Sequence, residues 1–201
     1  MKKMNKSLLA AAIGVALTSN SAMADIKLAE GLSVKGFVDM SFLYTDDDAA
    51  AETTQVFGID QVETDFMYEG ADGISAQVDI QYGESGDGSG ADETFVEEAY
   101  ITKKVNDQVS VKAGRFLSYS GWETAEPTGL YQYSAAGYGD LFYGGYQQGV
   151  SAYYDGAIDV MGSIVNNLAN PLDNDSENIS IELGVAVEPV EGVTAKLFYL
   201  T

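Results

Sequence analysis

The chain has 201 residues, with 10 lysine and arginine residues against 31 aspartate and glutamate residues, and a formal net charge of −21 at pH 7. Such acidity disfavours nucleic-acid binding, because nucleic-acid phosphates are bound by basic surfaces. Cysteine and histidine are absent, which excludes disulfides, Cys- or His-ligated metal sites and a Ser-His-Asp triad from these residues, so we expect no catalytic residues, no cofactor and no metal ion.

The first 24 residues have the pattern of a cleaved secretory signal peptide. Three lysines precede an apolar stretch over residues 8–17, and the small residues Ala22 and Ala24 precede Asp25. The apolar stretch is much shorter than the roughly 20 residues of a membrane-spanning helix, so we expect export and cleavage. Removing the three leader lysines from the 10 basic residues leaves 7 against 31 acidic residues, a charge of −24 for residues 25–201.

Residues 25–201 contain about nine segments with the period-two alternation of β-strands. The clearest are 74–82 and 179–187, in which apolar residues alternate with polar or small ones. The first segment, 32–44, exceeds the roughly 9 to 11 residues that a tilted strand needs to cross a bilayer. In chain order, we predict strands over 32–44, 56–68, 74–82, 94–105, 109–116, 146–154, 158–165 and 179–187, and from 193 to the end of the chain.

The connections between these segments alternate in length along the chain. Long connections are expected at 45–55, 83–93, 117–145 and 166–177, and short ones at 69–73, 106–108, 155–157 and 188–192. Outer-membrane barrels have short periplasmic turns and longer external loops, and only a closed barrel satisfies the backbone of strands in lipid. We therefore predict an all-β, antiparallel up-and-down transmembrane β-barrel over 25–201, with its N-terminus in the periplasm.

The number of predicted strands is odd, whereas an antiparallel barrel in one chain closes with an even number. We therefore expect the chain to be a C-terminally truncated, partial barrel with about nine strands present. The alternative is that the weak segment 146–154 is not a strand and that a small eight-stranded barrel is complete.

Several segments resemble the OmpL-like family of β-barrel porins. They are VEEAYI at 96–101, VKAGRF at 111–116, GWE at 121–123, GV at 149–150 and VNN at 165–167. The resemblance extends over about residues 90–201. It implies a barrel in the bacterial outer membrane through which small solutes diffuse passively. Members of this family are considerably longer than this chain, which agrees with truncation.

Arg115 is the only arginine of the chain and lies where the predicted strand 109–116 gives way to the longest loop. In general porins, a long loop folds into the lumen and sets acidic groups against basic wall residues. By resemblance, Glu123, Glu126 and Asp140 are expected to face Arg115 across a pore constriction, where the field between opposite charges orients polar solutes. The alternative is that Arg115 forms a structural ion pair that anchors the loop.

The polar parity of the predicted strands carries more acidic than basic side chains. If this parity faces the lumen, its carboxylates concentrate cations and lower the barrier to their passage. The alternative is that these are solvated wall residues without a selective role. The predicted pore-lining residues are Lys35, Asp39, Glu63, Asp65, Asp79, Glu98, Lys112 and Glu182.

The sequence therefore predicts a non-enzymatic outer-membrane porin that passes small hydrophilic solutes or ions and prefers cations. Three alternatives stay open: a non-channel structural or adhesive barrel with acidic surface loops, an outer-membrane hydrolase, which the lack of histidine disfavours, and a soluble secreted β-sandwich. The expected partners are membrane lipids, lipopolysaccharide, and small polar solutes or cations. Whether the protein forms a homotrimer is left open by the sequence.

Overall fold

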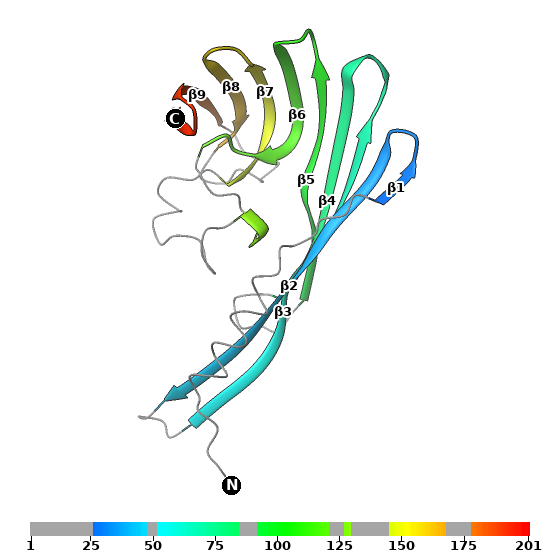
Figure 1. The fold of residues 1–201 in the computed structure, drawn as a ribbon, viewed down its shortest axis with the longest axis vertical. Coiled ribbons are helices and arrows are strands. Elements are labelled where there is room, and N and C mark those ends of the chain that lie inside the picture. The colour runs from blue at the N-terminus through cyan, green and yellow to red at the C-terminus, as the bar shows by residue number, and fades with distance from the viewer. Residues whose placement is uncertain (1–25, 48–51, 85–91, 121–126, 130–144, 168–177) are drawn as a thin grey trace.

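The computed structural model describes residues 26–47, 52–84, 92–120, 127–129, 145–167 and 178–201. These residues form one sheet of ten strands in which every strand pairs antiparallel with the next one in the chain (Figure 1). No described helix is long and apolar enough to cross a membrane. The strands are β1 (Ile26–Ala29), β2 (Leu32–Asp47), β3 (Glu52–Glu69), β4 (Ile74–Glu84), β5 (Asp92–Lys104), β6 (Val109–Leu117), β7 (Tyr146–Tyr154), β8 (Asp159–Asn166), β9 (Ile179–Val190) and β10 (Val193–Leu200), with the 3-10 turns η1 (Ala71–Gly73) and η2 (Pro127–Gly129).

The predicted all-β antiparallel fold is confirmed, and the nine predicted strands correspond to β2–β10. Segment 146–154 forms β7 and pairs with β6 over its whole length, so the alternative that it is not a strand is wrong. The additional strand is β1, which pairs with β2 through a turn at Gly31. Gly31 has a φ of 71°, a conformation that favours glycine. The predicted signal peptide lies outside the described residues.

The sheet curls into an arc with β1 at one side and β10 at the other (Figure 1). These two strands are not hydrogen-bonded to each other, so the sheet is not closed within the described residues. The turns between β3 and β4, β5 and β6, and β7 and β8 lie at one end, at the top of Figure 1. At the opposite end, β2 and β3 extend furthest, with 16 and 18 residues against 9 for β6.

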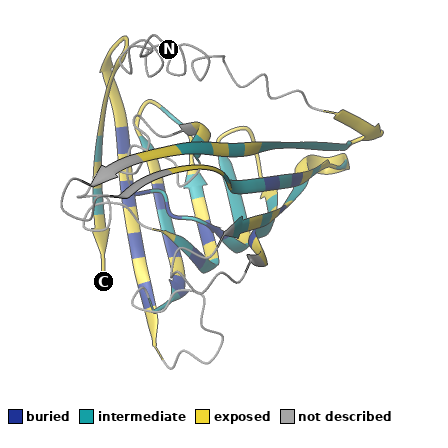
Figure 2. Cartoon of the chain, turned by 90° about the horizontal axis from the view of Figure 1, so that it is seen from below, coloured by how far each residue is buried: buried dark blue, intermediate teal, exposed yellow. Residues whose placement is uncertain are grey.

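The two faces of the sheet differ in chemistry. One face is apolar and exposed, as at Val78 of β4, Ile164 of β8 and Leu183 of β9. The other face is polar and more buried, so buried and exposed bands alternate along the strands (Figure 2). Lys35 of this polar face lines a pocket together with Thr128 of η2, and η2 lies within the curve of the sheet (Figure 1). The polar face is therefore the concave, inner face, and the apolar face is the outer face, as in an outer-membrane barrel.

Two β-bulges keep the apolar residues on the outer face. Asp60 of β3 is the extra residue where the pairing with β2 shifts, and Glu97 of β5 is the extra residue where the pairing with β4 shifts. Each bulge reverses the alternation of the residues that follow it, because two residues of one strand face one residue of its partner. In β5, this brings a second carboxylate, Glu97, beside Glu98.

Candidate functional site

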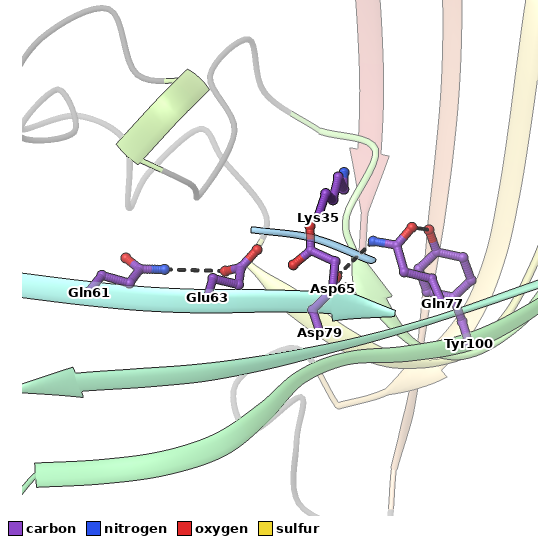
Figure 3. Close-up of polar contacts among 7 residues, drawn as sticks. All are labelled: Lys35, Gln61, Glu63, Asp65, Gln77, Asp79 and Tyr100. Atoms are coloured by element: carbon purple, nitrogen blue, oxygen red, sulfur yellow. Dashed lines mark hydrogen bonds and ion pairs between the residues drawn. The ribbon is translucent and has the colours of Figure 1, made fainter. Parts of the chain in front are cut away.

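Four charged residues form a row across the inner face at one level of β2, β3, β4 and β5. The register pairs Lys35 with Asp65, Asp65 with Asp79, and Asp79 with Glu98. Directly opposed residues of neighbouring antiparallel strands lie roughly 4.5–5.5 Å apart at Cβ, so the sheet holds one ammonium and three carboxylates side by side. We call these four residues the charged row; Figure 3 shows its first three members.

One oxygen of each aspartate in the charged row is held, in Asp65 by an ion pair and in Asp79 by a hydrogen bond (Figure 3). Lys35 Nζ lies 3.4 Å from Asp65 Oδ2, and Gln77 Nε2 donates to Asp79 Oδ2 at 2.7 Å. The Tyr100 hydroxyl donates to Gln77 Oε1 at 2.9 Å and so orients that amide. The other oxygen, Oδ1, of each aspartate has no hydrogen-bond partner within the described part of the chain.

The charged row is electrostatically costly for the fold. Asp65 and Asp79 are each only 4% exposed, and like charges directly opposed across strands destabilise a sheet. With one ammonium against three carboxylates, the row has a formal charge of −2. It lines a pocket of about 200 Å³ on the inner face, together with Glu63, Leu117 and other residues. An array that is unfavourable for stability and lines the inner wall is a candidate for an electrostatic function.

A second polar cluster, further along the inner face, holds the start of the longest connection against the wall. Glu182 of β9 is fully buried. Its Oε2 accepts a hydrogen bond from Gln147 Nε2 at 2.7 Å, and its Oε1 accepts one from the Ser118 hydroxyl. Ser118 and Ser120 are bonded to each other at 2.8 Å. Glu182 therefore lies on the inner face but anchors residues 118–120 rather than contacting an open lumen.

Lys112 also lies on the inner face, and its ammonium is surrounded by aromatic rings. Lys112 Nζ lies 4.2 Å from the centre of the Tyr100 ring and 5.6 Å from those of Phe116 and Tyr153, a cation–π arrangement. Tyr119 packs edge-on against Tyr153, and burial together with the Asp159 carboxylate raises the pKa of Tyr119. The Lys112 ammonium therefore faces the aromatic rings of Tyr100, Phe116 and Tyr153.

The structure brings all eight predicted pore-lining residues to the inner face. Asp39 is opposite Gln61 on this face, and Glu63 accepts a hydrogen bond from Gln61 Nε2 at 3.3 Å. Gln77, Tyr100 and Gln147 are not among the site residues predicted from the sequence. The period-two alternation of their strands predicts that these three residues lie on the inner face. Which carboxylate each of them contacts depends on the register between neighbouring strands, which the sequence does not show.

Arg115 lies on the outer face, which does not fit a role inside the pore. It pairs with Ala99 on one side and Gln148 on the other. Nη1 donates to the Val96 carbonyl at 2.6 Å, and Nη2 and Nε donate to Gln148 Oε1 at 3.1 and 3.3 Å. The predicted partners Glu123, Glu126 and Asp140 lie outside the described residues, so their place in a constriction stays a prediction.

An up-and-down sheet with an apolar outer face and a charged inner face defines the wall of a porin-type β-barrel. A comparison with family models agrees: the chain belongs to the family described as "Putative beta-barrel porin-2, OmpL-like", whose model matches residues 31–201. Membership of this porin family places the protein in the outer membrane, and such families are generally non-enzymatic. No curated protein matches the chain closely enough to count as a relative.

Proposed function

We propose that the protein is a non-enzymatic pore that passes small hydrophilic solutes and ions passively across the outer membrane and prefers cations to anions. The observation that carries the cation preference is the charged row, in which three carboxylates face one ammonium. Rings or rows of carboxylates in a pore wall raise the local concentration of cations and repel anions.

The surroundings of the charged row support the same proposal. Asp39, Glu63 and Glu97 lie on the same wall, so the inner faces of β2–β5 carry more acidic than basic groups. Of the basic side chains there, Lys35 is held by Asp65 at 3.4 Å. The Oδ1 atoms of Asp65 and Asp79 are buried and have no hydrogen-bond partner among the described residues, so these carboxylates attract a passing cation through their electrostatic field rather than by direct contact.

Reversal potentials of the full-length protein in planar bilayers test this proposal. Under a potassium chloride gradient, a cation-preferring pore gives a reversal potential of the sign set by potassium. A discrete conductance with anion preference would contradict the selectivity. Correctly folded protein without any discrete conductance would favour a non-channel structural or adhesive barrel instead.

A further inference from the structure

A polar row crosses the outer face at the loop-side ends of three neighbouring strands. Arg115 of β6 pairs with Gln148 of β7. Asn166 ends β8 and follows Val165, which pairs with Gly149, so Asn166 lies level with Gln148. We call Arg115, Gln148 and Asn166 the outer polar row. It interrupts a face that is otherwise apolar on these strands.

An open groove of about 580 Å³ runs along the outer polar row. It forms where β5 and β6 separate: their pairing ends at Ala99 and Arg115, although β6 continues to Leu117. Small residues on both sides leave space beside the guanidinium. The groove is lined by Val96, Ala99, Gly114, Arg115, Gln148, Gly149 and Asn166.

The Arg115 guanidinium has charge and donors left to offer a ligand. Its three nitrogens each make a described bond, but both acceptors, the Val96 carbonyl and the Gln148 amide oxygen, are neutral. A guanidinium has five N–H groups, so Nη1 and Nη2 each retain one. Among the described residues, Arg115 forms no ion pair. Two parallel N–H groups of an arginine match the oxygens of a phosphate group.

Arg115 lies along β6 at the level where the headgroups of the surrounding lipids are expected. β6 has nine residues, about the number needed to cross the hydrocarbon layer, and Arg115 is two residues from its loop-side end. On the same face, the preceding residues Val109, Val111 and Ala113 are apolar. A basic side chain on the lipid face is least costly near the interface. In the predicted orientation, the loop-side end faces the external leaflet, where lipopolysaccharide carries its phosphate groups.

We propose that the outer polar row binds a phosphate group of lipopolysaccharide from the lipid side of the wall. Arg115 donates two hydrogen bonds to the phosphate and neutralises it, while the amides of Gln148 and Asn166 contact the adjoining sugar. The bound headgroup fills the groove at the separation of β5 and β6. The site is distinct from the proposed pore, because it lies on the opposite face of the sheet.

Binding of defined lipids to the full-length protein in neutral detergent, measured by native mass spectrometry, tests this site. The probes are phosphorylated lipid A, dephosphorylated lipid A, phosphatidylglycerol and inorganic phosphate. We expect the wild-type protein to bind phosphorylated lipid A at least about tenfold more tightly than each of the other probes. Dephosphorylated lipid A cannot accept the charge-assisted bidentate hydrogen bonds of Arg115. Phosphatidylglycerol and inorganic phosphate can accept them, but they lack the sugar that Gln148 and Asn166 contact. Equal binding of the two lipid A forms would overturn the proposal. Equal binding of phosphatidylglycerol or inorganic phosphate would reduce the site to a general anion site and overturn it as well.

Variants assign the effect to Arg115. Arg115→Gln keeps a polar amide at this position but loses the charge, and should lower the affinity for phosphorylated lipid A about tenfold. Lys103→Gln is the matched control, because Lys103 pairs with Val111 on the same face at the opposite end of the strands. An unchanged affinity in Arg115→Gln, or an equal loss in Lys103→Gln, would contradict the site. If Arg115→Gln does not fold, Arg115→Lys keeps the charge and the wild-type comparison of the two lipid A forms still decides.

Discussion

Replacing Asp79 by asparagine removes one negative charge from the centre of the charged row while keeping the shape of the side chain. The formal charge of the row then changes from −2 to −1, since Asp65 and Glu98 remain against Lys35. A unit charge attracts a cation 4 Å away by about 1 kcal/mol in water, and by about 4 kcal/mol at an effective dielectric constant of 20. The wall of a water-filled pore is closer to the first case. About 1 kcal/mol corresponds to a roughly fivefold lower local concentration of cations.

The assay is the ratio of potassium to chloride permeability, obtained from reversal potentials of the full-length protein in planar bilayers. We expect Asp79→Asn to lower this ratio several-fold while the protein remains folded. Asp72→Asn is the matched control, because Asp72 lies in the exposed turn η1 outside the charged row, and asparagine tolerates its φ of 59°. If Asp79→Asn keeps the wild-type ratio in an open channel, the charged row does not set the selectivity and the reasoning is refuted.

Three further predictions concern the charged row and the wall around it. Lys35→Gln leaves three carboxylates without their ammonium, so the potassium preference should rise in the same assay; a fall would contradict the role of the row. Gly114→Ala should destabilise the folded state by about 2 kcal/mol or more in urea unfolding, because the new Cβ would lie 2.2 Å from the Ala99 carbonyl oxygen at a φ of 133°; Gly145→Ala, whose Cβ meets nothing within 4 Å, should be neutral. Glu182→Ala leaves the buried Ser118 and Gln147 donors without their acceptor and should cost about 2 kcal/mol, whereas wild-type stability would show that this cluster does not anchor residues 118–120.

The strands could be predicted from the sequence because the two faces of the wall impose a period of two on each of them. β9 shows this most clearly, since Ile179, Ile181 and Leu183 face outward and alternate with the buried Ser180 and Glu182. The predicted start of β9 and both ends of β7 agree with the structure. β1 was missed because its four residues are too few to show a period, and its turn depends on the positive φ of Gly31.

The irregular alternation of β3 has a physical cause that the sequence does not reveal. Phe57 and Ile59 lie on the outer face before the bulge at Asp60, whereas Val62 and Phe66 lie on it afterwards. A single alternation therefore cannot fit the whole strand. Bulges are defined by pairing with the neighbouring strand, so one strand read alone gives no sign of them. The charged row also depends on the pairing of neighbouring strands. The alternation in the sequence predicts that its four residues lie on the same face, but only the register of the four strands brings them to one level.

The outward position of Arg115 could have been inferred from its spacing to Lys112. Residues three apart on one regular strand lie on opposite faces, so an inward Lys112 requires an outward Arg115 as long as β6 remains regular to its end. Continuous pairing of β6 with β7 from Val109 to Leu117 shows that it does. An inward Arg115 would require the predicted strand 109–116 to become irregular before its end. The consequence is functional: the one arginine of the chain lies outside the proposed pore, so it does not offset the negative charge of the carboxylates on the inner face.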